Sequence, residues 1–260
     1  MITITSRDNQ YLKLARSLHS KKGRSISESF LVEGLRLCGE AVQSSLQLRL
    51  ALIDVEADQR SYQLAALLEE RGIPVYQLPT ALFATISATE HSQGIAIIAA
   101  LPKPVQLSSS GHCYALCDGI ADPGNLGTII RSAYAAGVSG LILGPGCADP
   151  YNPKTVRSAM GGLFHLPLVK TAHNEEALAI AQQLDLAILV TAMDGLDIRQ
   201  AESWLQQPHL WVLGSEANGV SSFWRERATA SISLPMRDGA ESLNVATAAT
   251  VLFYQSFFVK

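Results

Sequence analysis

Short runs of apolar residues recur along the whole chain, and segments with helical spacing separate them. In the first part of the chain we expect strands at 29–34, 48–54 and 73–78, and a polar turn followed by a buried strand over 91–101. Helices should lie between them, over 37–42 and 62–70. Strands that alternate with helices in this way indicate a small α/β layer structure. An amphipathic helix over 8–20 should precede it, because apolar residues recur there at helical spacing.

The apolar runs of the second half are nearly continuous. They cover 113–118, 140–144, 186–193 and 210–214. Such runs, separated by helices, indicate a parallel sheet with both faces covered. Prolines and serines between the two series mark a linker. The sequence therefore predicts an N-terminal domain over 1–103, a linker over 104–111 and a C-terminal domain over 112–260.

Three apolar runs of the second half lead into turns rich in Gly, Asn and acidic residues. The stretches are 118–133 (DGIADPGNLGTIIRSA), 210–221 (LWVLGSEANGVS) and 231–254 (SISLPMRDGAESLNVATAATVLFY). A helix after each turn would bring unpaired N–H groups and a positive dipole end to the sheet's edge. One such connection is equally well an ordinary capped helix, with Ser242 as N-cap in the third stretch. Three of the same polar character indicate one shared ligand site.

Composition places the chain among folded proteins. With 260 residues, 48% of them hydrophobic and 17% charged, it can bury a full core, which excludes disorder. Its four cysteines lack CxxC spacing, so we expect buried thiols in a reducing compartment and no metal site. No secretory signal opens the chain, and polar residues interrupt the apolar closing helix. We expect a cytoplasmic protein that does not span a membrane.

Positive charge gathers near the start of the chain, although the net charge is −3. Residues 1–50 carry eight Lys or Arg against four acidic residues. The segment KKGRS (21–25) should form a flexible basic loop that can follow a phosphate backbone. A solvated basic face would look the same, so charge alone does not decide for RNA. The candidate RNA contacts are Arg7, Lys13, Lys21, Lys22 and Arg24, with Lys154 and Arg157 exposed on a helix after Pro153.

Together, the three polar stretches resemble the three motifs of the SpoU (TrmH-type) RNA ribose 2′-O-methyltransferases, within the SPOUT superfamily. The matching residues are Asp122, Pro123, Asn125, Gly127 and Arg131, then Gly214, Glu216 and Gly219, then Pro235, Met236 and the run Ser242-Leu243-Asn244-Val245. The third turn departs slightly from the family, which has its glycine one place earlier than Gly239. More loosely, FLVEG (30–34) and SATEHSQGIAII (87–98) resemble the substrate-binding domain of many SpoU enzymes, which looks like a ribosomal-protein RNA-binding fold.

The resemblance implies a cofactor, a fold and an assembly that residue patterns do not give. It implies S-adenosyl-L-methionine as methyl donor, an RNA-binding-like N-terminal α/β domain, and a C-terminal parallel-sheet domain with a trefoil knot. Topology rules alone would exclude a knot, because connections rarely thread. The resemblance also implies a homodimer packed through the knotted region. The apolar closing helix offers a surface for it, although core burial explains that helix equally well.

Site residues follow from the same resemblance. Main-chain groups around Gly214, Leu234 and Leu243 would hold the cofactor, and Pro235 and Met236 would shape its pocket; core packing is the alternative, above all for Leu234. The catalytic set would be Asn125, Arg131, Glu216, Ser242 and Asn244. Arg131 matches the family's catalytic arginine, sometimes described as a base. Because a guanidinium stays protonated at ordinary pH, holding a phosphate or stabilising alkoxide charge asks less of it.

The remaining members of the set have structural alternatives. Asn125 would cap its helix or align Arg131 and the ribose. Glu216 would order the substrate or Arg131, or cap a helix starting near Ser221. Ser242 and Asn244 would hydrogen-bond the cofactor or the nucleotide.

The sequence favours methylation of ribosomal RNA, because the N-terminal domain resembles a ribosomal-protein fold. Transfer RNA is an alternative substrate, and a non-catalytic RNA-binding assembly factor is an alternative function, although the intact motif residues count against it. A nucleotide-dependent enzyme acting on a small molecule is disfavoured, because the chain has neither G-x-G-x-x-G after a strand nor a phosphate-loop lysine.

Overall fold

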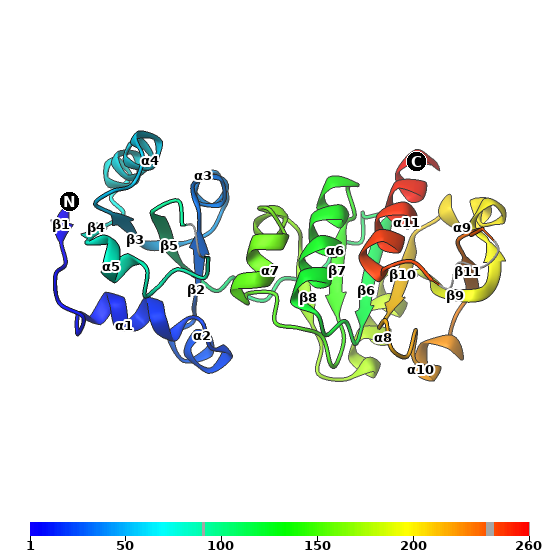
Figure 1. The fold of residues 1–260 in the computed structure, drawn as a ribbon. Coiled ribbons are helices and arrows are strands. Elements are labelled where there is room, and N and C mark those ends of the chain that lie inside the picture. The colour runs from blue at the N-terminus through cyan, green and yellow to red at the C-terminus, as the bar shows by residue number, and fades with distance from the viewer. Residues whose placement is uncertain (90–91, 238–241, 260) are drawn as a thin grey trace. The chain divides into compact units, whose positions relative to one another are not determined.

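The two predicted series of strands form two separate sheets in the computed structural model, which describes residues 1–89, 92–237 and 242–259. Each sheet belongs to its own compact unit (Figure 1). Unit 1 consists of Met1–Lys103 and Asp149–His165, and unit 2 of Pro104–Ala148 and Leu166–Lys260. The α/β class is confirmed. The two units are not two continuous segments of the chain, however, because residues 149–165 belong to unit 1.

Unit 1 contains a mixed sheet with the strand order β1-β4-β3-β5-β2. β5 runs antiparallel to β2 and β3, whereas β4 is parallel to β1 and β3. The strands are β1 (Ile2–Thr3), β2 (Ser29–Glu33), β3 (Leu48–Asp54), β4 (Val75–Leu78) and β5 (Ile95–Ala100). The helices are α1 (Gln10–Ser17), α2 (Lys21–Ser27), α3 (Leu35–Gln43), α4 (Gln59–Glu70), α5 (Thr80–Phe83) and α7 (Pro153–Ser158). The apolar side of α1 packs on the sheet, where Leu12 meets the inward residues of β2, β3 and β5.

Residues 21–25 are helical, so the prediction of a flexible loop there is wrong. The hydroxyl of Ser20 caps α2 by accepting a hydrogen bond from the N–H of Gly23 (3.0 Å). A Cβ on Gly23 would lie 2.0 Å from the carbonyl oxygen of Ser17, so the close approach of α1 and α2 requires glycine. Glycine serves packing here, a role that the local composition does not reveal.

The segment 149–165 packs on β2 of unit 1. Its helix α7 lies against that strand, and the ring of Phe30 lies 5.0 Å from the ring of Tyr151 and 6.3 Å from that of Phe164, between centroids. Burial raises the pKa of Tyr151 to about 12, which fits a phenol held inside this aromatic cluster. This docking could not be predicted from the sequence, because apolar aromatic residues serve any core equally well.

Arg24, a candidate RNA contact, is buried in unit 1. Only 3% of its side chain is exposed, and its Nη2 lies 2.7 Å from Oδ2 of Asp149. Its Nη1 donates to the carbonyl oxygen of Leu18 (2.8 Å). The guanidinium is buried and its donors are occupied by these contacts, so the prediction that Arg24 binds RNA is wrong. It fastens the segment 149–165 to α2 instead.

Replacing Arg24 by alanine should destabilise the protein. The change leaves Asp149 without its buried partner, and breaking a buried pair in this way costs about 3–5 kcal/mol. Lys22→Ala on the same helix removes an exposed cation and should change the free energy of unfolding by less than about 0.5 kcal/mol. Urea unfolding of the two variants measures the difference. Equal stability of the two would show that the buried pair does not hold this segment.

Unit 2 contains a six-stranded sheet, in the order β11-β9-β10-β6-β7-β8, whose neighbouring strands all run parallel. The strands are β6 (Cys113–Asp118), β7 (Gly140–Leu143), β8 (Leu168–Lys170), β9 (Ala187–Asp197), β10 (His209–Gly214) and β11 (Ala230–Ser233). The helices are α6 (Pro123–Ala135), α8 (Asn174–Gln183), α9 (Glu202–Leu205), α10 (Ser222–Arg225) and α11 (Val245–Val259).

Helices cover both faces of this sheet, which explains the continuous apolar runs of its central strands. Alternate residues of β6 and β10, such as Tyr114 and Leu210, pack with α8 and α10. The residues between them face the other side, where Trp211 of β10 donates to Ser256 of α11 (2.9 Å). α6 and α11 pack together on that side, and a hydrogen bond joins Ser132 to Thr250 (2.7 Å). Every residue of β6 and β10 is buried, so the predicted doubly covered parallel sheet is confirmed.

The four cysteines lie in the interior or partly so. Cys38, Cys113 and Cys117 are buried, and Cys147 is partly buried. Within the described ranges, His, Cys, Asp and Glu form no cluster that could hold a metal ion. No helix in the same ranges is both long and apolar enough to cross a membrane.

Candidate active site

The carboxyl ends of β6 and β10 meet at the point where the strand order of unit 2 reverses. From β6 the chain continues outward through β7 and β8, and it later returns to place β10 on the other side of β6. The last residues of the two strands, Asp118 and Gly214, are register partners. The loops after both strands therefore leave the sheet side by side. Open parallel sheets bind ligands at such a switch point.

The three predicted motifs meet at Asn125. The side-chain Nδ2 of Asn125 donates to Oε1 of Glu216, which lies on the loop after β10. Its Oδ1 accepts a hydrogen bond from Nδ2 of Asn244 (3.0 Å), just before α11. The side-chain amide of Asn125 thus contacts two residues that lie 91 and 119 positions later in the chain. The structure brings Asn125, Glu216 and Asn244 together, as a shared site requires.

One of the two interpretations of Asn125 is that its side chain caps α6. The structure rules this out. Asp122 caps α6 by accepting a hydrogen bond from the N–H of Asn125 (2.8 Å). Asn125 therefore lies in the first turn, which leaves its side chain to connect the motifs. Asn244 has a double role, because its Oδ1 also accepts from the N–H groups of Ala246 (3.0 Å) and Thr247 (3.3 Å). Asn244, and not Ser242, caps α11.

The loop after β10 folds back tightly on Gly214. The N–H of Gly219 donates to the carbonyl oxygen of Ser215 (2.8 Å), and Gly219 has φ +64°. A Cβ on Gly214 would lie 2.1 Å from backbone atoms of Gly219 and Val220, so only glycine fits there. Glu216 stands exposed on this loop. Its contact is Asn125, so neither capping of α10 nor a pairing with Arg131 describes its position.

Asp118 is a residue of the site that sequence reasoning missed. It is buried at the end of β6, and its Oδ2 accepts a hydrogen bond from the N–H of Ser221 (2.7 Å). This contact joins the end of β6 to Ser221, which follows the loop that carries Glu216. An acidic residue directly after five apolar ones was the available signal.

Arg131 lies on the exposed side of α6, six residues after Asn125. Within the described ranges it forms no hydrogen bond or ion pair, so its guanidinium is available to a ligand. The structure does not connect it to Glu216 or Asn244.

The predicted cofactor residues follow β11 at the same edge of the sheet. β9 separates β11 from β10, so their ends lie roughly 10 Å apart. Leu234 and Met236 are half-buried, Pro235 is exposed, and Leu243 is 43% exposed. These side chains leave apolar surface uncovered, so Leu234 is not simply a core residue. Ser242 is exposed, and the turn expected around Gly239 falls on residues 238–241, which lie outside the described residues.

Comparison with protein families identifies this arrangement. Residues 112–254 match the model of the SpoU rRNA Methylase family, and residues 9–97 match the MRM3-like substrate binding domain. The chain belongs to the SpoU rRNA methylase family. The first match contains all three polar stretches, so the family resemblance drawn from them is confirmed.

Similar proteins extend over nearly the whole length of this SpoU methylase. It is 35% identical to the 23S rRNA (guanosine(2553)-2′-O)-methyltransferase RlmP of Bacillus subtilis, covering 98% of both chains. It is 31% identical to the 23S rRNA (uridine(2479)-2′-O)-methyltransferase of Streptomyces viridochromogenes, covering 97% of this chain and 91% of the relative. Among solved structures it is similar to the SpoU methyltransferase AviRb of S. viridochromogenes in complex with AdoMet, with a TM-score of 0.83, 28% identity, and coverage of 96% and 97%.

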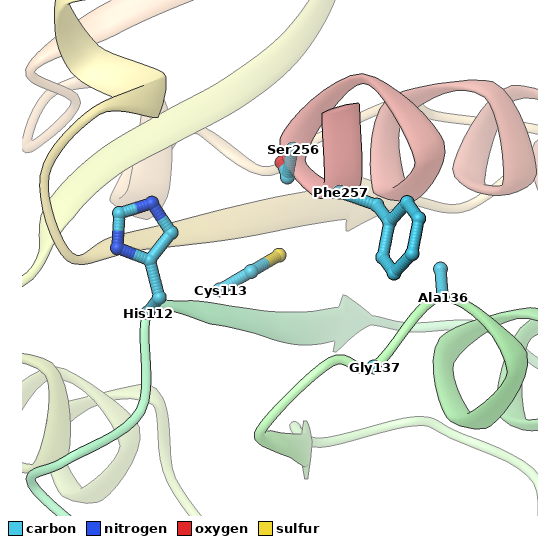
Figure 2. Close-up of a pocket in the computed structure, with 6 residues that line it drawn as sticks. All are labelled: His112, Cys113, Ala136, Gly137, Ser256 and Phe257. Atoms are coloured by element: carbon cyan, nitrogen blue, oxygen red, sulfur yellow. The ribbon is translucent and has the colours of Figure 1, made fainter. Parts of the chain in front are cut away.

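A pocket of about 250 Å³ lies at the opposite edge of the SpoU domain and has no part in this site (Figure 2). Its lining includes His112 and Cys113 at the start of β6, together with Ser256 and Phe257 of α11. Amino-terminal strand ends lie at the edge away from Asn125. Ligands of open parallel sheets bind at the carboxyl ends, so we assign this pocket no role in methyl transfer.

A buried histidine beside this pocket makes the stability of the SpoU domain depend on pH. His209 is fully buried, and its Nδ1–H donates to the carbonyl oxygen of Gln207 (2.8 Å). Its Nε2 must then accept from the hydroxyl of Ser256 (2.8 Å). Burial lowers the pKa of His209 to about 4, and the nearby His112 acts in the same direction. Folding therefore favours the neutral ring.

We expect this to appear as acid sensitivity between about pH 6.5 and pH 4. The unfolded chain binds a proton at the ordinary histidine pKa, above that of the folded state, so stability is complete above about pH 6.5 and falls with pH. The contribution between pH 7 and pH 5 is on the order of 2 kcal/mol. Urea unfolding at both values should show that His209→Gln loses this part of the pH dependence. The matched change His173→Gln, at an exposed residue, should keep it, and identical profiles for both variants would contradict the assignment.

The remaining candidate RNA contacts are exposed. Arg7, Lys21, Lys22, Lys154 and Arg157 lie on the surface of unit 1, and Lys13 pairs with Asp8 (3.0 Å) where both side chains are exposed. Their contact with RNA stays a prediction.

Proposed function

We propose that this chain transfers a methyl group from S-adenosylmethionine to a ribose 2′-hydroxyl of structured RNA, and that the RNA is ribosomal. The observation that carries the proposal is the meeting of three SpoU motifs at the Asn125 side chain, at the switch point of the parallel sheet. Two relatives that match over almost the whole chain are named 23S rRNA 2′-O-methyltransferases. Ribosomal RNA is therefore the preferred substrate class.

The residues at the sheet's edge fit the cofactor. Leu234, Met236 and Leu243 leave apolar surface uncovered, which suits an adenine ring, and the tight loop at Gly214 brings main-chain groups to the same edge. Pro235 would shape the slot. When bound, S-adenosylmethionine supplies an electrophilic methyl group.

The chain's own residues have to position the ribose and manage charge as its hydroxyl loses a proton. Arg131 is exposed and without a partner in the described ranges, so it can hold the phosphate beside the ribose or stabilise the alkoxide that develops. Asn125 and Asn244 hold Glu216 and the start of α11 in fixed places. Ser242, exposed beside them, would bind the nucleotide. Fixed polar groups lower the cost of orienting the hydroxyl toward the donor.

Mapping 2′-O-methyl groups tests the proposal. Total RNA from cells with and without the protein should differ at a position in large-subunit ribosomal RNA, and the purified protein should methylate that position in vitro. Ribonuclease treatment should abolish methyl transfer to RNA, whereas methyl transfer to a small-molecule acceptor would be unchanged. A changed position in transfer RNA would overturn the substrate class. Absence of S-adenosylmethionine binding in calorimetry would indicate a non-catalytic RNA-binding factor.

The proposal includes a homodimer. α6 and α11 pack side by side and leave apolar side chains uncovered, namely Tyr134, Val251, Phe257 and Phe258, which are 49%, 39%, 51% and 74% exposed. Such a patch indicates a protein interface. Arg131 lies one turn before Tyr134, so a partner on this patch would approach the proposed site. Sedimentation should give twice the chain mass of 27.9 kDa, and a single-chain mass would contradict the dimer.

The trefoil knot and the location remain expectations from the family. We expect the knot in the C-terminal domain, because that domain matches the SpoU family model. A ribosomal RNA substrate would place the activity where ribosomal subunits assemble, which is the cytoplasm in bacteria such as those of the similar proteins. The N-terminal domain would bind RNA through Arg7, Lys13, Lys21, Lys22, Lys154 and Arg157.

A further inference from the structure

A second pocket, of about 420 Å³, lies in unit 1 beside β2. One part of its lining comes from β2, the start of α3, Thr89 and Gln93, and the other part comes from the segment with α7. Ligand pockets of proteins have volumes of this order. The pocket thus depends on the docking of residues 149–165, which Arg24 and Phe30 secure.

The inner lining is apolar. Leu31, Leu37 and Val156 are buried, with 3%, 5% and 2% of their surface exposed, and Met160 adds a half-buried thioether. A flat apolar group can rest on such a surface.

Glu33 is the acidic residue among the lining residues, and its carboxylate is already occupied. Its Oε1 accepts hydrogen bonds from the hydroxyls of Ser87 (2.5 Å), Thr89 (3.1 Å) and Ser92 (3.1 Å), and its Oε2 accepts from the N–H of Ala88 (2.8 Å). These bonds fix the chain around the pocket. They also engage both oxygens of the carboxylate, and within the described ranges Glu33 forms an ion pair with neither Arg36 nor Arg157.

Donors that lack partners surround the opening. Arg36 and Arg157 are exposed lining residues, and neither forms a hydrogen bond or ion pair with the part of the chain that the structure describes. Gln93 accepts at Oε1 from the N–H of Leu35 (2.9 Å), whereas its Nε2 makes no hydrogen bond within the described ranges. The pocket therefore combines an apolar lining with two guanidinium groups and an amide donor.

We propose that this pocket holds one unstacked nucleotide of the RNA substrate, its phosphate bound by Arg36 and Arg157 and its base placed on the apolar lining beside Gln93. The inference rests on the proposed function. Two cations suit a phosphate, an apolar surface suits the face of a base, and the amide donor suits a base acceptor. Proteins read RNA through such splayed-out bases more readily than through the deep groove of a helix.

RNA binding by the full-length protein tests the phosphate contacts. The probe is large-subunit ribosomal RNA transcribed in vitro, and the variants are Arg36→Gln/Arg157→Gln and a control, Arg60→Gln/Lys103→Gln. The control removes two exposed cations from unit 1 outside the pocket. The pocket variant should bind at least about tenfold more weakly, and its salt slope, log K against log salt, should fall by roughly 1 to 2. An equal effect of both double changes would overturn the proposal.

Gln93→Glu tests the base contact without disturbing the pocket. The substitution keeps an oxygen for the N–H of Leu35 and replaces the Nε2 donor by a carboxylate oxygen. We expect several-fold weaker binding of the same RNA with an unchanged melting temperature. Wild-type affinity would contradict the placement of the base.

Methylation kinetics separate this inference from the proposed function. Arg36→Gln/Arg157→Gln should raise KM for RNA while kcat at saturating RNA and the Kd for S-adenosylmethionine stay at wild-type values. If the wild type methylates RNA and the variant keeps its KM, the inference alone fails. If the wild type transfers no methyl group but the variant still binds RNA selectively more weakly, the proposed function alone fails.

A free nucleotide has the same chemistry as one within RNA. Titration of the four 5′-mononucleotides into the wild-type protein distinguishes the two sources. Because the pocket would supply only a part of the contact with RNA, we expect no saturable binding of a free nucleotide below about 1 mM. Tighter binding that the Arg36→Gln/Arg157→Gln variant loses would assign the pocket to free nucleotides and overturn its assignment to RNA.

Discussion

Arg131→Ala should reduce methyl transfer by about a hundred- to a thousandfold, because it removes the cation proposed to act on the developing alkoxide or its phosphate. S-adenosylmethionine binding and the melting temperature should stay at wild-type values, since Arg131 is exposed and forms no hydrogen bond or ion pair within the described ranges. Single-turnover methylation and calorimetry measure the two effects separately. Wild-type turnover in the variant would remove Arg131 from the site.

Two further variants sharpen this result. Arg131→Lys keeps the charge and loses the planar fork, so partial activity would favour electrostatic stabilisation over bidentate phosphate binding. Arg227→Ala is the matched control in the same unit. Arg227 precedes β11 and lies at the opposite edge of the sheet, so its loss should leave turnover unchanged. An equal loss in this control would show that the effect of Arg131→Ala is not local.

Gly214→Ala should damage both stability and catalysis. The new Cβ would lie 2.1 Å from backbone atoms of Gly219 and Val220, which are not flexible side-chain ends that can move aside. Forcing the loop outward should cost about 1–3 kcal/mol of unfolding free energy. Displacing Glu216 and the main-chain groups of the loop by about 1 Å should lower kcat/KM by roughly a hundredfold.

Gly39→Ala is the control for this change. Gly39 lies within α3, where a Cβ would have no neighbour within 4 Å. Alanine there should stabilise the helix by about 0.5–1 kcal/mol and leave activity intact. Thermal unfolding and methylation assays of both variants make the comparison. Normal activity in Gly214→Ala would show that the tight loop is not needed to organise the site.

The convergence of the motifs could be predicted because it follows from chain direction. β6, β10 and β11 are parallel, so residues after their carboxyl ends share one edge of the sheet whatever the loops do in detail. The strand pattern and the motifs were therefore sufficient to predict that Asn125, Glu216 and Asn244 lie near one another. Which side chain contacts which could not be predicted. Asn125 serves as the connection and not as a cap because Asp122 already takes the cap.

The clustering of positive charge in the sequence was the least reliable basis for predicting RNA contacts. Arg24 has the same sequence environment as Lys21 and Lys22, yet it is buried against Asp149, whereas the lysines are exposed. The residues next to Arg24 in the sequence do not indicate its partner, Asp149, which lies 125 positions away. Arg36 and Arg157 are likewise far apart in the sequence, yet both line one pocket, a combination that no local pattern contains.

The sequence by itself determined the two sheets, the edge at which the site forms and the family. These depend on the order of apolar runs and on short motifs, which are properties of neighbouring residues. Only the tertiary structure decided that residues 149–165 complete the N-terminal unit, that Asp118 braces the loop of Glu216, and that Arg24 is structural. Each of these depends on a contact between distant segments, and its stability comes from burial, which a residue acquires only when the chain has folded.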